Sequence, residues 1–157
     1  MKKQLFKKSS ISEHIATIDV SHNLQYKYIN GYYEAGNELV NIAINEKQGS
    51  YKKDILFYPI CYNYRHYIEL HLKSLIVDLE ILYDKMNQLG YLKNGTLSEK
   101  KSDKLDSTHN INDLFKFFYE RLNLVSDEPF PNDIKKYIKQ MHDMDKNGQK
   151  FRYPVNK

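Results

Sequence analysis

The apolar positions of residues 57–79 recur at steps of three and four, the period of an amphipathic helix. The stripe consists of Phe57, Ile60, Cys61, Tyr64, Tyr67, Ile68, Leu72, Leu75, Ile76 and Leu79. Pro59 lacks a backbone N–H, so the helix is expected to begin near Phe57 or to bend there, and to continue through Met86 before Gly90. We expect this long helix to be the centre of the fold.

Three further helices are predicted from the same periodicity. The first runs from a cap near Ser21 to Gly49, the second is capped by Thr108 or Asn110, and the third is capped by Asn132. Together with the central helix they predict an all-α bundle.

Two segments lack a strong apolar pattern. Residues 1–20 are basic and are expected to form a loosely ordered N-terminal segment, with residues 21–157 as one helical domain. Residues 93–108 are rich in lysine, and they predict a long, mobile polar loop between the second and third main helices.

The composition narrows the class of protein. Hydrophobic residues make up 41% of the chain and charged residues 28%, which is typical of a globular domain. No apolar run is long enough to cross a bilayer and no secretory signal pattern is present, so we expect no membrane association and a cytoplasmic location. The net charge of +4 is compatible with a polyanionic partner, although the basic residues are spread among 20 acidic ones. The 14 tyrosines suit half-buried helix interfaces and oligomer contacts, with base stacking as the alternative.

Common catalytic and metal-binding motifs are absent from the sequence. His66 and His71 are five residues apart and therefore on divergent helix faces, unlike the four-residue spacing that directs two imidazoles at one ion. The chain has no glycine-rich phosphate loop, nucleophile elbow or recognisable Cys–His pair. We therefore expect no metal and no other cofactor.

The remaining chemistry lies on the central helix, in Arg65, His66, Glu69, His71 and Lys73. A guanidinium and an imidazole close together could hold a phosphate and move its proton, as metal-independent RNA cleavage requires. In the alternative interpretation, Arg65 pairs with Glu69 four residues along the helix, and the histidines satisfy buried polar partners.

Three short pieces together resemble the HEPN superfamily of prokaryotic helical domains, over roughly residues 22–157. They are YRHYIELHLK at 64–73, THNINDL at 108–114 and FRYP at 151–154. The resemblance implies a four- or five-helix bundle that commonly dimerises. It also implies a role in toxin–antitoxin modules, phage defence or other conflicts between mobile elements and their hosts.

The resemblance also implies a candidate catalytic pair. Active members of the superfamily are metal-independent RNases with an arginine followed, after four to six residues, by a histidine, and Arg65 and His71 have this spacing. The sequence departs from the family because the motif usually lies on a late helix, where Arg121 has no histidine at the right distance. Six steps on a regular helix also turn about 240°, so the pair would face one point only if the helix is irregular or a second subunit completes the site.

The leading hypothesis is a HEPN-like homodimer that binds RNA, with metal-independent cleavage of that RNA as a further step that the site could perform. Its site would comprise Arg65 and His71 as catalytic residues, with His66, Glu69, Lys73, His109 and Arg152 binding the substrate. The alternative is a non-catalytic interaction module that binds a partner protein or a nucleotide through the tyrosine-rich surface and the central helix. Arg65 locked to Glu69 would favour the module, whereas Arg65 and His71 converging in an open cleft would favour the nuclease.

Overall fold

The computed structural model describes residues 24–92 and 95–153, and within these residues it is helical, with no strand. The elements are α1 (Leu24–Asn45), α2 (Tyr51–Gln88), the short 3-10 helix η2 (Ser102–Lys104), α3 (Ile111–Val125) and α4 (Asn132–Met144). This arrangement confirms the predicted all-α bundle. The predicted N-terminal segment 1–20 and the cap at Ser21 lie outside the described residues. None of the described helices is both long and apolar enough to cross a membrane.

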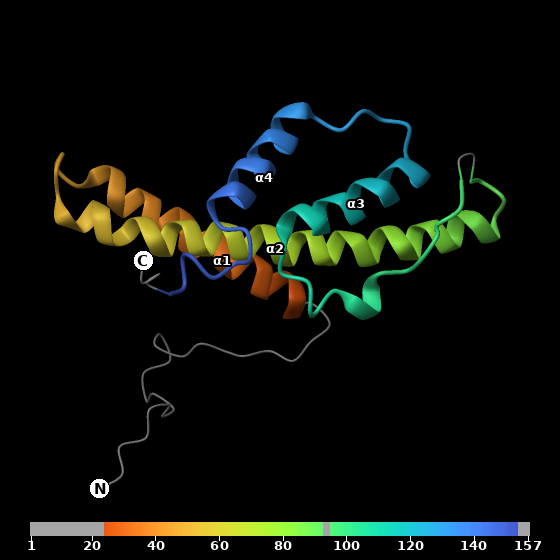
Figure 1. Cartoon of the computed structure of the whole chain (residues 1–157), viewed down its shortest axis with the longest axis horizontal. Helices are drawn as coiled ribbons and strands as arrows, with labels where there is room; N and C mark the ends of the chain where they lie inside the picture. Colours follow the sequence, from red (N-terminus) through yellow and green to blue (C-terminus); the bar gives the residue numbers. More distant parts are fainter. Residues whose placement is uncertain (1–23, 93–94, 154–157) are drawn as a thin grey trace, which may run out of the picture.

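Helix α2 is the axis of the molecule. Its 38 residues correspond to a length of about 57 Å at 1.5 Å per residue. Figure 1 shows α1 crossing the N-terminal half of α2, α3 running along the C-terminal half, and α4 inclined over the middle on the same side as α3. Helices α1 and α3 therefore pack directly along α2.

Of the two predicted alternatives at Pro59, a helix that begins near Phe57 is wrong, because Pro59 lies inside α2. The helix begins at Tyr51, and its first turn is capped by Ser50, whose Oγ accepts a hydrogen bond from the amide of Lys52 at 3.2 Å. Pro59 lies inside the helix, where the side-chain amide of Asn63 donates to the Pro59 carbonyl at 2.7 Å. The cap at Ser50 thus starts the helix about two turns before the proline, and the helix continues through Pro59.

The hydrophobic core lies where α2 meets α3. Leu72 and Ile76, four residues apart on α2, pack against Leu114 and Phe118, which have the same spacing on α3. Leu105, from the connection between the two helices, completes this cluster. Burying such side chains stabilises a fold by roughly 1.5–3 kcal/mol each, so this layer fixes the position of α3 on α2.

The polar connection between α2 and α3 is present as predicted, but part of it is anchored to the bundle. The buried Glu80 carboxylate accepts hydrogen bonds from the amides of Lys101, at 2.8 Å, and Ser102, at 3.3 Å. Buried Arg121 donates from Nε to the same carboxylate at 2.6 Å and from Nη2 to the Glu99 carbonyl at 2.9 Å. These hydrogen bonds tie residues 99–102, which lead into η2, to α2 and α3. The prediction of a mobile loop is therefore wrong for this part.

The predicted helix caps are partly confirmed. Asn110, one of the two candidates, caps α3 by accepting hydrogen bonds from the amides of Asn112 and Asp113 at 3.0 and 3.3 Å. Asn132 is the first residue of α4 rather than its cap, because Pro131 occupies the preceding position. The cap at Asn110 also fixes the backbone of His109, which belongs to the candidate site.

Candidate functional site

One face of α2 gathers polar side chains from four parts of the chain. Tyr62, His66, Glu69 and Lys73 are spaced by four, three and four residues, so they form one stripe along the helix. We define the polar site as these four residues together with Tyr32 of α1, His109 before α3 and Arg152 after α4.

Glu69 is the charged centre of the polar site and is only 2% exposed. Its Oε1 accepts a hydrogen bond from Lys73 Nζ at 3.1 Å and lies 2.9 Å from His109 Nδ1, while Oε2 accepts from Arg65 Nη1 at 2.9 Å. Burial by itself raises the pKa of Glu69, but these three hydrogen bonds outweigh it and hold the pKa below the usual 4.5. The carboxylate is therefore ionised at neutral pH.

Arg65 lies beneath the polar site and is 2% exposed. Its Nη2 donates to the His109 carbonyl at 2.6 Å, and its Nε lies 3.3 Å from both the carbonyl and a carboxylate oxygen of Asp145. The backbone of Gly148 packs against the guanidinium so closely that a Cβ there would lie 3.0 Å from Arg65 Cζ. Arg65 therefore joins α2, the start of α3 and the end of α4, and its position is that of a structural ion pair.

His109 is the histidine that the site presents to solvent, with its side chain 55% exposed. Because the Glu69 carboxylate can only accept, the neutral ring of His109 carries its proton on Nδ1, which leaves the Nε2 lone pair directed away from Glu69. An exposed imidazole held by a buried carboxylate can exchange a proton with a ligand through Nε2, and it donates to a phosphate oxygen once Nε2 carries that proton.

His66 occupies the aromatic half of the polar site. Its ring stacks on Tyr62, with centroids 5.6 Å apart, and meets Tyr32 edge-on at 4.4 Å. Burial lowers the pKa of His66 below 6.5 despite the opposing charge of Glu69, and Arg152 lowers it further. Its Nδ1 is buried and has no hydrogen-bond partner among the described residues. The Arg152 guanidinium lies over the Tyr62 ring, 5.2 Å from its centroid.

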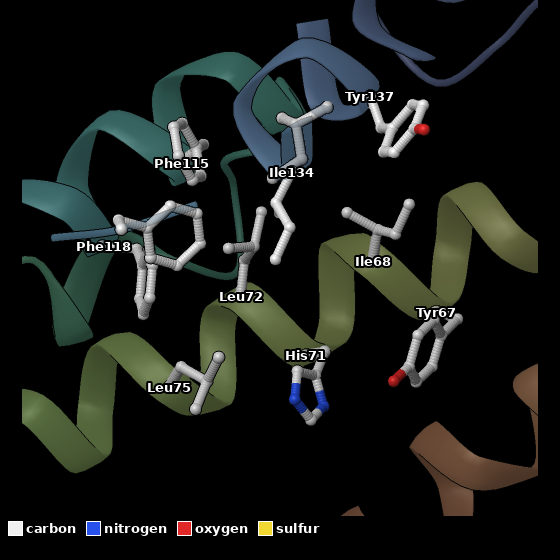
Figure 2. Close-up of a pocket in the computed structure, with 11 residues that line it drawn as sticks. Tyr67, Ile68, His71, Leu72, Leu75, Phe115, Phe118, Ile134 and Tyr137 are labelled. Atoms are coloured by element: carbon white, nitrogen blue, oxygen red, sulfur yellow. The ribbon is translucent and has the colours of Figure 1, made fainter. Parts of the chain in front are cut away.

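His71 lies outside the polar site. Figure 2 shows its ring pointing away from α3 and α4, whereas Ile68 and Leu72 point toward them. It is exposed, while Arg65 is buried in ion pairs, so the structure does not bring the predicted catalytic pair together. On a regular helix such as α2, side chains six residues apart are separated by a turn of about 240° and therefore point to different sides.

The predicted substrate-binding residues, by contrast, do gather. His66, Glu69, Lys73, His109 and Arg152 all belong to the polar site. Tyr32 and Tyr62 also contribute to this site and were not predicted from the sequence. The four-residue step from Tyr62 to His66 was the signal that could have placed Tyr62 on the same face.

A second surface, which we call the apolar groove, lies between α2, α3 and α4 (Figure 2). It has a volume of about 260 Å³ and is lined by Tyr67, Ile68, His71, Leu72, Leu75, Phe115, Phe118, Phe130, Ile134, Tyr137 and Ile138. Ile134 and Tyr137, on α4, are 43% and 67% exposed. Large apolar side chains thus remain in contact with solvent at its edge.

No family model matches the chain, and no curated protein or solved structure is similar to it at a significant level. Within residues 24–92 and 95–153, no group of three or more histidine, cysteine, aspartate or glutamate side chains is arranged to hold a metal ion.

Proposed function

We propose that this chain is a HEPN-like module of a bacterial or phage conflict system that binds RNA in the cytoplasm through the polar site. The observation that supports this proposal is the convergence of Lys73, Arg152, His66 and His109 around one face of α2. Ammonium, guanidinium and imidazole groups bind phosphate oxygens, and this electrostatic term dominates affinity for nucleic acid.

The polar site can accept an anion even though it contains Glu69. That carboxylate is 2% exposed and already receives hydrogen bonds from Arg65 and Lys73. Its charge is therefore neutralised from within the fold. Lys73 is 13% exposed at its side chain and retains further N–H donors, while Arg152 and His109 are exposed. The groups that a phosphodiester would meet first are the cations of Lys73 and Arg152, together with the His109 ring once its Nε2 is protonated.

The geometry supports binding more directly than cleavage by Arg65 and His71, because Arg65 is locked to Glu69 and Asp145. This is the arrangement that the sequence analysis associated with a non-catalytic module. If the site transfers a proton, His109 is placed for it, since Glu69 orients its ring and its other nitrogen faces outward.

RNA binding is tested by fluorescence anisotropy with a labelled mixed-sequence 12-mer at low and moderate salt. Arg152→Ala should weaken binding about tenfold and reduce its salt dependence by about one ion. Lys136→Ala on α4, 71% exposed and outside the polar site, removes the same charge and should change little. Equal losses in the two variants, or no binding by wild type at low salt, would contradict the proposal.

A second candidate function, binding of a protein, rests on the apolar groove, and we propose that its occupant is a second copy of this chain. A two-fold contact uses the same surface twice, so that surface must carry both a cavity and protruding side chains. The groove supplies the cavity, and Ile134 and Tyr137 at its edge supply the protruding side chains. In this proposal, the homodimer interface lies on α4 and the middle of α2.

The dimer is tested by light scattering coupled to gel filtration. Tyr137→Glu should shift a dimer to monomer, because it places a charge in an apolar contact. Gln140→Glu puts the same charge on an exposed position of α4 outside the groove lining and should leave the mass unchanged. A wild-type monomer at high concentration would exclude this occupant.

A further inference from the structure

A second cavity adjoins the polar site, and we call it the aromatic pocket. It has a volume of about 400 Å³ and is lined by Tyr58, Pro59, Tyr62, Phe151, Arg152 and Tyr153. Tyr62 and Arg152 belong to both the pocket and the polar site, so the two are continuous.

The chain after α4 is held in place by buried groups, which fixes one wall of the pocket. Asp145 accepts hydrogen bonds from the amides of Gln149 and Lys150 at 2.9 and 3.1 Å, closing a turn at the end of α4. Phe151 is 7% exposed, and its ring lies 6.4 Å from that of Phe57. This anchorage leaves the next two side chains, Arg152 and Tyr153, exposed.

Two tyrosines of the pocket expose most of their side-chain surface. Tyr58 and Tyr153 are 55% and 63% exposed, so each keeps a large aromatic surface in water. Tyr62 already supports a planar cation, the guanidinium of Arg152, 5.2 Å from its ring centroid. Exposed aromatic rings beside an arginine suit a ligand that is planar and aromatic at one end and anionic at the other.

We infer that the aromatic pocket holds an unpaired nucleobase whose phosphate is bound by Arg152, so that the ligand is single-stranded rather than duplex RNA. This inference rests on the proposed RNA binding at the polar site. Single-strand binding proteins combine cationic groups along the backbone with aromatic rings on which bases stack. A base within a duplex is already stacked on both faces and cannot enter a pocket of this kind, and the A-form major groove is too narrow for side chains to read.

The first experiment needs no variant. Wild-type protein is titrated, at one salt concentration, with three labelled probes of equal phosphate count: a single-stranded RNA, the same sequence as a duplex, and an abasic ribose-phosphate strand. The single strand should bind about tenfold more tightly than either of the others, since stacking contributes only there. Equal affinity for the single strand and the abasic strand would overturn the base pocket while leaving phosphate binding intact. Binding of none of the probes would overturn the proposed function as well.

The second experiment locates the effect. Tyr58→Ala combined with Tyr153→Ala should weaken binding of the single strand about tenfold and leave binding of the abasic strand unchanged. Tyr91→Ala, at a tyrosine of similar exposure, 65%, just after α2, is the matched control and should change neither. Wild-type affinity of the double variant for the single strand would overturn the inference.

Discussion

Arg65 is the residue at which the structure and the sequence-based hypothesis differ most, and one substitution separates them. Arg65→Met retains an unbranched side chain but removes the guanidinium that pairs with Glu69 at 2.9 Å and with Asp145 at 3.3 Å. Both carboxylates are 2% exposed. Removing one member of a buried ion pair typically costs about 3–5 kcal/mol, because the remaining charge stays buried without its partner.

The structure places the expected cost at the lower end of that range. Glu69 retains its hydrogen bonds from Lys73 and His109, whereas Asp145 loses the cation at 3.3 Å from its second carboxylate oxygen. We therefore expect a loss of about 3 kcal/mol, equivalent to a fall in melting temperature of about 6–12 °C for a chain of this length.

Urea unfolding followed by circular dichroism measures this loss. Lys139→Met is the control, since Lys139 is 70% exposed and its pair with Asp143 lies at the surface, and its midpoint should stay within error of wild type. If Arg65→Met loses less than about 1 kcal/mol while RNA binding disappears, Arg65 contacts ligand instead of holding the fold, and the account of the ion pair is refuted.

Gly148→Ala should lower the free energy of unfolding, measured with urea, by more than Gly49→Ala does. Both glycines have positive φ, at +76° and +75°, which alone should cost about 1–2 kcal/mol in each variant. Only at Gly148 would the added Cβ also meet described atoms within 4 Å. Because the pKa of Glu69 is lowered in the folded state, its carboxylate contributes stability above about pH 4.5, and this stability is lost as the pH falls through the folded-state pKa. Glu69→Gln should therefore make the free energy of unfolding depend less on pH on the acid side. An unchanged pH dependence would show that the carboxylate is not stabilised as described. Any cleavage of labelled RNA in EDTA should disappear in His109→Ala and persist in His71→Ala, and the reverse result would restore His71 as the catalytic histidine.

The fold was largely predictable because its helices are amphipathic. The positions of Leu72 and Ile76, and of Leu114 and Phe118, repeat at helical spacing in the sequence and meet in the core. Boundaries were harder to predict, since Ser50 starts α2 before Pro59 and overrides the usual effect of a proline. The anchorage of the polar loop was not visible, because Glu80 and Arg121 are 41 residues apart and no local pattern pairs them.

The candidate site was predictable only along α2 itself. Helical geometry alone places Glu69 and Lys73 on one face and turns His71 away from Arg65. The contacts that decide the role of Arg65 come from Asp145 and the His109 carbonyl, 80 and 44 residues away in the chain. Such contacts depend on how α3 and α4 pack against α2. The sequence could therefore offer the ion pair of Arg65 as an alternative to a catalytic role, but it could not decide between the two.

Histidine side-chain NMR shows whether RNA occupies the polar site. The ring C–H signals are assigned by single substitutions, and the protein is then titrated with single-stranded RNA at low salt. We predict that the signals of His66 and His109 shift with a common affinity while that of His71 stays in place, because His71 points away from the polar site. A shift of His71 with His66 and His109 unmoved would place the ligand elsewhere and contradict the account.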